Sequence, residues 1–87
     1  MDKKFWSLYI VLCAQGAYYT GISNDVPKRI EKHNTGKGAK CMKMLGTPVT
    51  LLYTEPIGTY SQALKRERQV KKYTRKKKEE LISRNKP

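Results

Sequence analysis

Residues 5–22 read FWSLYIVLCAQGAYYTGI, and this stretch decides the fold. Two runs rich in aromatic and β-branched residues flank a short segment at 14–16 that contains glycine, which is typical of a β-hairpin. Side chains alternate along a strand, so one face of the first strand carries Trp6, Leu8, Ile10 and Leu12, and the other carries Phe5, Ser7, Tyr9, Val11 and Cys13. We therefore predict a hairpin whose first strand is buried on one face and mixed on the other.

The segment after the hairpin has the residues of a helix start. Asn24 or Asp25 can cap a helix, and Pro27 suits the first turn because its missing N–H costs nothing there. The helix is predicted to end at about Asn34, before an exposed basic loop at 35–47 that contains two glycines.

The rest of the chain predicts one strand and two helices. The third strand is expected at residues 49–54, after which Pro56 and Gly58 interrupt the chain. Ser61 is expected to cap a second helix that ends at about Tyr73.

Thr74 is expected to cap a short last helix that reaches Ser83. The order β-β-α-β-α-α predicts an α+β fold, in which helices flank a small, mostly antiparallel, three-stranded sheet. Because a chain of 87 residues suits one domain, we expect a single domain over residues 1–83 and a frayed tail at 84–87.

The charge balance indicates a polyanionic partner. The chain has 19 Lys and Arg against 7 Asp and Glu, a formal net charge of +12. Such a field attracts polyanions, and counterion release from nucleic-acid phosphates then favours binding. We expect DNA as the partner, with RNA as the alternative. The lysines expected to contact it are Lys28, Lys32, Lys37, Lys40, Lys43, Lys71 and Lys72.

Several other classes of protein do not fit. Cys13 and Cys41 are too few for a disulfide framework, and with His33 they lack the fourth ligand and the short spacing of a zinc site. The apolar run that ends at Ala14 is about ten residues long, which is too short to span a membrane. The glycines at 36 and 38 lack the spacing of a P-loop. We expect a cytoplasmic protein with no membrane contact.

Glu67, in the second predicted helix, lies on an unusual face for a carboxylate. At about 100° per residue it falls within the apolar stripe of Ala63, Leu64 and Val70. A carboxylate on the inward side of a helix costs free energy unless it is paired, hydrogen-bonded or metal-bound. Glu67 is therefore either a metal ligand or a member of a structural ion pair with a nearby Arg.

Arg29 and His33 are spaced i, i+4 on the first predicted helix, so they share one stripe beside Val26 and Ile30. The planar fork of donors on Arg suits a phosphate. His33 is either a satisfied group at the helix end or part of the same site.

Tyr9 and Tyr19 come from the two strands of the hairpin. A tyrosine acts as a general base only if its pKa falls well below its usual value of about 10, and a positive field acts in that direction. Both rings can face one pocket only if an odd-length loop or a bulge puts them on one face of the sheet. An even pairing, with Cys13 opposite Tyr18, would direct them apart. Plain aromatic packing is the alternative for either ring.

Taken in order, these positions resemble the GIY-YIG nuclease superfamily, and in particular its short, single-domain bacterial group. Ser7-Leu8-Tyr9 occupies the GIY position and Tyr19-Thr20-Gly21 the YIG position, followed by Arg29, His33 and Glu67. The resemblance covers residues 6–82, although the first motif lacks its Gly and its Ile.

The resemblance implies a metal-dependent endonuclease that hydrolyses phosphodiester bonds in DNA, structure-specific or repair-related. It implies that Glu67 holds Mg²⁺ or Mn²⁺ and that Arg29 neutralises charge on the phosphate. One of Tyr9 and Tyr19 would take a proton from water and the other would position that water, while His33 would hydrogen-bond to a tyrosine or to the phosphate. Larger relatives use an added DNA-binding or partner domain, so we expect a partner protein to supply specificity here.

The alternative is a non-catalytic or weakly catalytic module of the same fold that binds DNA or RNA. Charge alone would also fit an RNA-associated structural protein. Tyr9, Tyr19, Arg29 and Glu67 together favour the nuclease, because a pure binding protein has no use for a carboxylate that repels phosphate.

Overall fold

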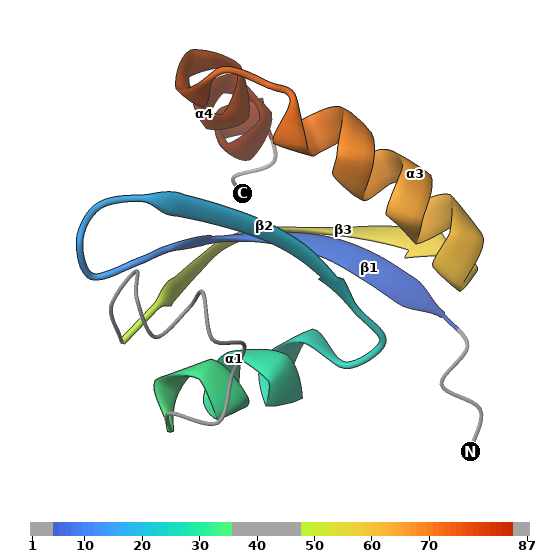
Figure 1. Ribbon diagram of the computed structural model, residues 1–87, viewed down its shortest axis with the longest axis horizontal. Coiled ribbons are helices and arrows are strands. Elements are labelled where there is room, and N and C mark those ends of the chain that lie inside the picture. The colour runs from blue at the N-terminus through green and yellow to red at the C-terminus, as the bar shows by residue number, and fades with distance from the viewer. Residues whose placement is uncertain (1–4, 36–47, 85–87) are drawn as a thin grey trace.

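The computed structural model describes residues 5–35 and 48–84. Its strands are β1 (Trp6–Leu12), β2 (Tyr18–Ser23) and β3 (Thr50–Gly58), and its helices are α1 (Val26–Asn34), α3 (Tyr60–Lys71) and α4 (Arg75–Arg84). The strands form one antiparallel sheet in the order β2-β1-β3. α1 covers one face of this sheet, and α3 and α4 cover the other (Figure 1). The predicted α+β fold and its element order are confirmed.

β1 is the central strand and is buried on both faces. Leu8 and Ile10 pack in a cluster with Val70 of α3, while Tyr9 and Val11 belong to a second cluster on the face that α1 covers. The second face is nevertheless mixed, as expected, because Phe5 is exposed and Ser7 is half-buried at its start. Helices cover both faces of the sheet, so residues 8–11 in the middle of the central strand are buried.

The hairpin register puts Tyr9 and Tyr19 on the same face of the sheet. Tyr9 pairs with Gly21 and Val11 pairs with Tyr19, and the last pair, Leu12 with Tyr18, leaves an odd-length loop. Because side chains alternate, residues 9 and 19 then point to one side. The geometric condition for a shared pocket is met.

β3 continues past the point where the sequence predicted an end. Pro56 lies inside the strand and pairs with Ser7, and the β1–β3 pairing shifts register at two places. The predicted break at Pro56 is wrong because β3 is an edge strand, where a proline without an N–H is tolerated, whereas the strand does end at Gly58.

α1 begins as predicted. The Asp25 side chain accepts a hydrogen bond from the backbone N–H of Lys28 at 3.2 Å, and Pro27 lies in the first turn. The helix ends at Asn34, also as predicted.

α3 begins two residues earlier than predicted and ends at Lys71. Its cap is Thr59, whose hydroxyl accepts from the N–H of Gln62 at 3.2 Å while the Gln62 side chain accepts from the N–H of Thr59 at 3.0 Å. This reciprocal capping box decides the start. Ser61, the predicted cap, has Leu64 three residues later, which cannot return the hydrogen bond.

α4 is capped by Thr74 as predicted, since its hydroxyl accepts from the N–H of Lys77 at 3.2 Å. The helix includes Arg84, one residue beyond the expected end, and residues 85–87 lie outside the described part of the chain. Arg75 attaches α4 to the hairpin: its guanidinium lies 4.2 Å from the centre of the Tyr18 ring and donates to the carbonyl of Gly16. Within the described ranges, none of the helices has the length and apolar character needed to cross a membrane.

Candidate active site

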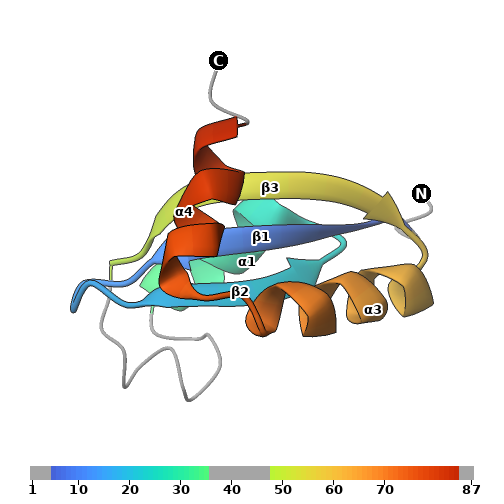
Figure 2. The same cartoon turned by 90° about the horizontal axis from the view of Figure 1, so that it is seen from above.

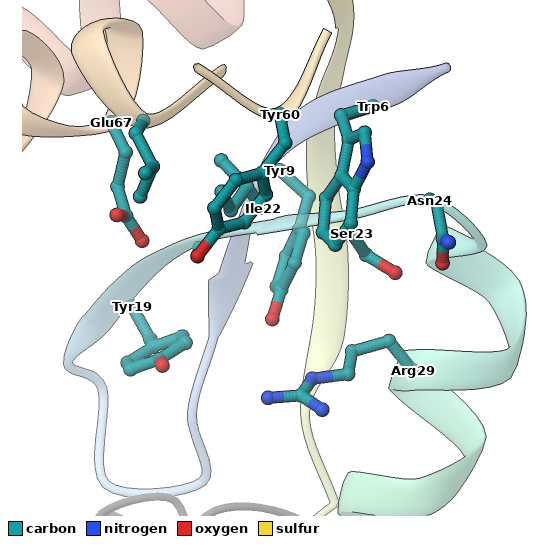
Figure 3. Close-up of a pocket in the computed structure, with 11 residues that line it drawn as sticks. Trp6, Tyr9, Tyr19, Ile22, Ser23, Asn24, Arg29, Tyr60 and Glu67 are labelled. Atoms are coloured by element: carbon teal, nitrogen blue, oxygen red, sulfur yellow. The ribbon is translucent and has the colours of Figure 1, made fainter. Parts of the chain in front are cut away.

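α3 runs beside β2, an edge strand of the sheet (Figure 2). A cavity of about 360 Å³ is lined by residues of both elements (Figure 3). Tyr9 of β1, Tyr19 of β2, Arg29 of α1 and Glu67 of α3 all line it. Figure 3 shows these side chains directed toward one space from different elements. The structure thus brings together four residues that are far apart in the sequence, and the fifth predicted residue, His33, contacts both tyrosines.

Tyr9 and His33 form a buried polar pair below the cavity. The Tyr9 hydroxyl lies 3.4 Å from Nε2 of His33, and each side chain is 1% exposed. Burial, and then the positive charge of Arg29, lower the pKa of His33 below its ordinary value of 6.5. The imidazole is therefore neutral near pH 7 and can accept the tyrosine proton at Nε2.

Tyr19 packs against both members of this pair. Its ring centre lies 6.4 Å from that of Tyr9 and 6.1 Å from that of His33, which it meets edge to face. These distances are within the usual range for aromatic pairs, about 4.5–7 Å. Two phenols and one imidazole are thus packed as a unit on the α1 side of the sheet.

Gly21 allows this arrangement. A Cβ atom on Gly21 would lie 2.6 Å from the Tyr9 hydroxyl oxygen and 2.8 Å from Cζ of the same ring. The side chain of Tyr9 therefore lies directly across the β2 backbone, which is possible only because its partner in the register is a glycine. Gly21 thus makes room for the Tyr9 ring at this point of the hairpin.

Arg29 is half-buried, and its Nε atom is fully buried without a hydrogen-bond partner among the described residues. A buried donor that lacks a partner costs about 1–3 kcal/mol, and more when the group is charged. Nε itself is out of reach of the cavity, but the guanidinium that carries it lines the cavity and is directed into it (Figure 3). Arg29 is accordingly suited to bind a phosphate oxygen.

Glu67 lies on the inward side of α3, between the buried residues Ala63 and Val70. Its side chain is only 17% exposed, and Oε2 lies 3.4 Å from Nζ of Lys71. The partner is a half-exposed lysine one turn later, not the arginine that the structural alternative proposed. A flexible lysine on the surface can move away when another cation arrives.

Glu55 and Arg66 attach α3 to β3. Arg66 donates from Nε to one carboxylate oxygen of Glu55 at 2.8 Å and from Nη2 to the other at 3.1 Å. The Tyr53 hydroxyl donates to the same carboxylate. Bidentate Arg–carboxylate pairs have a defined geometry, so this contact restricts rotation of α3 about its own axis. With Arg66 held toward β3, the next residue, Glu67, points toward the cavity.

The pKa values in this network follow from its contacts. Burial and the hydrogen bond to Glu55 raise the pKa of Tyr53 to about 12. Burial alone would raise the pKa of Glu55, but hydrogen bonds from Arg66 and Tyr53 outweigh it and hold that pKa below 4.5. The carboxylate of Glu55 thus stays ionised and paired at neutral pH. Sequence analysis missed this pair because its members are 11 residues apart in different elements.

The donors present fit one kind of metal site. Among residues 5–35 and 48–84, no group of three or more His, Cys, Asp and Glu side chains could hold an ion. Mg²⁺ usually keeps several waters and binds through one or two carboxylates together with substrate phosphates. Glu67 on the wall of a cavity that Arg29 also lines fits that pattern.

The predicted nucleic-acid contacts fall into two described groups. Lys28 and Lys32 are exposed on α1, where they line a smaller groove of about 110 Å³ beside Arg29. Lys71 and Lys72 are exposed at the end of α3. The remaining predicted contacts, Lys37, Lys40 and Lys43, lie outside the described residues.

Comparison with known proteins identifies relatives over nearly the whole chain. The model of the GIY-YIG catalytic domain matches residues 5–80. UPF0213 proteins of Staphylococcus saprophyticus and Staphylococcus aureus are 51% and 52% identical to this chain, covering 95% and 94% of it and 98% and 96% of the relatives.

Two solution NMR structures have the same fold. A UPF0213 protein of Bacillus halodurans is 39% identical with a TM-score of 0.60, over 93% of this chain and 85% of that one. A protein of E. faecalis is 37% identical with a TM-score of 0.63, over 94% and 86%.

Proposed function

Because the chain belongs to the GIY-YIG family of nuclease domains, we propose that it is a metal-dependent endonuclease that hydrolyses phosphodiester bonds in DNA. The observation that supports this most is the single cavity lined by Tyr9, Tyr19, Arg29 and Glu67. A phosphate group needs cationic donors, and hydrolysis needs a proton acceptor and a ligand for a hard cation. Residues of all three kinds face the same space.

Arg29 would bind an oxygen of the scissile phosphate, since its guanidinium lines the cavity and is directed into it. The guanidinium then offsets the negative charge that grows on the phosphate in the transition state. Glu67 would hold Mg²⁺ or Mn²⁺, which when bound polarises the phosphoryl group and stabilises the leaving oxygen.

We assign the proton-accepting role to Tyr9. Its hydroxyl contacts Nε2 of His33, an imidazole that burial and Arg29 keep neutral. When Tyr9 donates its proton toward His33, the lone pairs of the phenolic oxygen are available to the attacking water. The water then transfers a proton to Tyr9 as Tyr9 transfers its own to His33, and Tyr19 positions the water.

The alternative is a DNA- or RNA-binding module without substantial catalysis. The contact between Lys71 and Glu67 favours it, because a carboxylate that stays paired with a lysine does not bind a metal. In either case Lys28, Lys32, Lys71 and Lys72 would contact phosphates, and a partner protein would add specificity.

A cleavage assay on plasmid, branched and single-stranded DNA, with Mg²⁺, Mn²⁺ or EDTA, separates the two. Glu67→Gln and Arg29→Ala are expected to abolish cleavage while DNA binding persists. The matched controls are Glu31→Gln, an exposed acid on α1, and Arg68→Ala, an exposed arginine on α3, which should cleave normally. Cleavage that survives in Glu67→Gln contradicts the nuclease proposal, as does a wild-type protein that binds DNA without cutting any substrate.

A further inference from the structure

Besides the groups that a phosphate requires, two further aromatic residues line the cavity. They are Trp6 and Tyr60, whose ring centres are 4.8 Å apart with planes inclined by 64°. Figure 3 shows Tyr60 between Glu67 and Trp6. A volume of about 360 Å³ lies within the range of about 300–1,000 Å³ for pockets that bind small molecules. The cavity thus has room for a second group next to a phosphate.

Tyr60 is not needed to fill the core. It is 52% exposed and is the first residue of α3, with the buried clusters formed by other residues of that helix. Leu64 and Glu67 follow it on the cavity side of α3, since all three residues line the same cavity. An apolar, aromatic surface therefore adjoins the polar groups, with half of the Tyr60 ring open to solvent.

This combination matches what a nucleic-acid strand presents. A strand offers a phosphate and, one sugar away, a flat base, and aromatic side chains stack on bases in proteins that bind single strands. Tyr9, Arg29 and Glu67 supply the polar contacts for the phosphate. Trp6 and Tyr60 supply aromatic contacts on the wall of the same cavity.

On the basis of the proposed function, we propose that Trp6 and Tyr60 form a stacking wall for one unpaired nucleobase beside the bound phosphate. The substrate class is then nucleic acid with a free base at the cleavage site, as in single strands, flaps and branch points. A base within a continuous duplex has both faces covered by its neighbours, so it cannot stack on this wall without leaving the helix. Intact duplex is bound only through its phosphates.

The wall can be tested without cleavage, by measuring affinity in EDTA for a single-stranded oligonucleotide and for a blunt duplex of the same length. Stacking on one aromatic side chain contributes about 1–3 kcal/mol per base, so Tyr60→Ala should weaken single-strand binding about 5- to 150-fold. Tyr60→Phe keeps the ring and should bind normally. Phe5→Ala is the matched control, because Phe5 is an exposed aromatic next to Trp6 that does not line the cavity.

Trp6 also serves as an internal reporter, because it is the single tryptophan of the chain. Single strands should quench its fluorescence more than the duplex does. Oligonucleotides that carry one abasic residue at different positions give a second test. At one position only, the missing base should weaken binding to the wild type as much as Tyr60→Ala does, and the same oligonucleotide should not weaken binding to Tyr60→Ala any further.

Equal losses on single strand and duplex, or no loss in Tyr60→Ala, would overturn the stacking proposal. Thermal unfolding of Tyr60→Ala verifies that the variant is folded. Because binding is measured without metal, a protein that stacks bases but never cleaves DNA would keep this inference while the nuclease proposal fails. If the protein cleaves DNA but shows no preference for unpaired bases, the nuclease proposal stands and the stacking proposal fails.

Discussion

The hydroxyl of Tyr9 lies 3.4 Å from Nε2 of His33, and both side chains are almost completely buried. One residue comes from the central strand and the other from the last turn of α1, so this contact joins the two elements below the cavity. Because burial and Arg29 lower the pKa of His33, the imidazole is neutral near pH 7 and shares a hydrogen bond with the tyrosine hydroxyl. The pair therefore orients the tyrosine hydroxyl that lines the cavity.

Tyr9→Phe removes this hydroxyl and little else. The cleavage rate should fall by about 10²–10⁴, the usual contribution of a general base, while the free energy of unfolding changes by about 1 kcal/mol. The rate is measured at saturating DNA and the stability by urea unfolding. Tyr18→Phe is the control, because its hydroxyl contacts Glu79 on the surface outside the cavity. A Tyr9→Phe variant as active as Tyr18→Phe would remove Tyr9 from the proposed mechanism.

Stability should depend on pH through His33. Since its pKa in the folded chain is below 6.5, the unfolded chain binds the proton first as the pH falls. The stabilising contribution is thus fully present above about pH 6.5 and is lost as the pH falls from there toward the folded pKa. Urea unfolding between about pH 7 and pH 5 should show this loss in the wild type and a flatter profile in His33→Gln.

A second loss of stability, from Glu55, is expected only at lower pH and in both proteins. The pKa of Glu55 is below 4.5 in the folded chain, so its contribution is present above that pH and is lost below it. If wild type and His33→Gln had parallel profiles between pH 7 and pH 5, the neutral state of His33 would not be linked to folding.

Gly21→Ala should displace the Tyr9 side chain, which lines the cavity. The new Cβ would lie 2.6 Å from the Tyr9 hydroxyl oxygen, so the ring or the β2 backbone must move. Overpacking of this kind costs about 1–3 kcal/mol, and a displaced Tyr9 should also lower the cleavage rate at temperatures where the variant is fully folded.

Gly16→Ala is the matched control for Gly21→Ala. Gly16 has a φ of 88°, and a Cβ there would meet no atom within 4 Å. The substitution should cost about 1–2 kcal/mol through backbone strain and leave the activity of the folded protein unchanged. Circular dichroism and cleavage assays on both variants test this difference, and equal activity in the two would show that Tyr9 tolerates the shift.

Lys71 and a metal ion should compete for Glu67. The ammonium lies 3.4 Å from the carboxylate and is half-exposed, and such pairs are worth about 0–1 kcal/mol. Lys71→Ala should therefore tighten Mn²⁺ binding by up to about fivefold, measured by water-proton relaxation or calorimetry in the absence of DNA. Lys72→Ala, an exposed neighbour, should leave the affinity unchanged. Equal affinities in the wild type and both variants would show that no competition exists.

The elements that follow local rules were predictable. The loop glycine of the hairpin and the cap at Asp25 act through neighbours a few residues away, and the inward position of Glu67 follows from the helical repeat. The start of α3 was also readable, because Thr59 and Gln62 have the spacing of a capping box. Ser61 is the weaker cap because Leu64, three residues later, cannot return a hydrogen bond.

Other features depend on which segments meet. β3 continues through Pro56 because it is an edge strand of the sheet. Whether a strand lies at the edge depends on which other strands pair with it, so its own residues do not reveal this. The Glu55–Arg66 pair, which sets the direction of Glu67, forms between β3 and α3. Trp6 and Tyr60, on β1 and α3, gave no sign in the sequence that they would share a cavity.

The sequence by itself determined the strands, the helices and their inward faces, because hydrogen bonds and side-chain periodicity within an element involve residues close along the chain. It also determined the strongly basic charge and hence the kind of partner. Only the tertiary structure decided that Tyr9, Arg29 and Glu67 line one cavity and that an aromatic pair lines it too. That outcome depends on how both faces of a three-stranded sheet are covered, and packing between distant segments is a property of the whole fold.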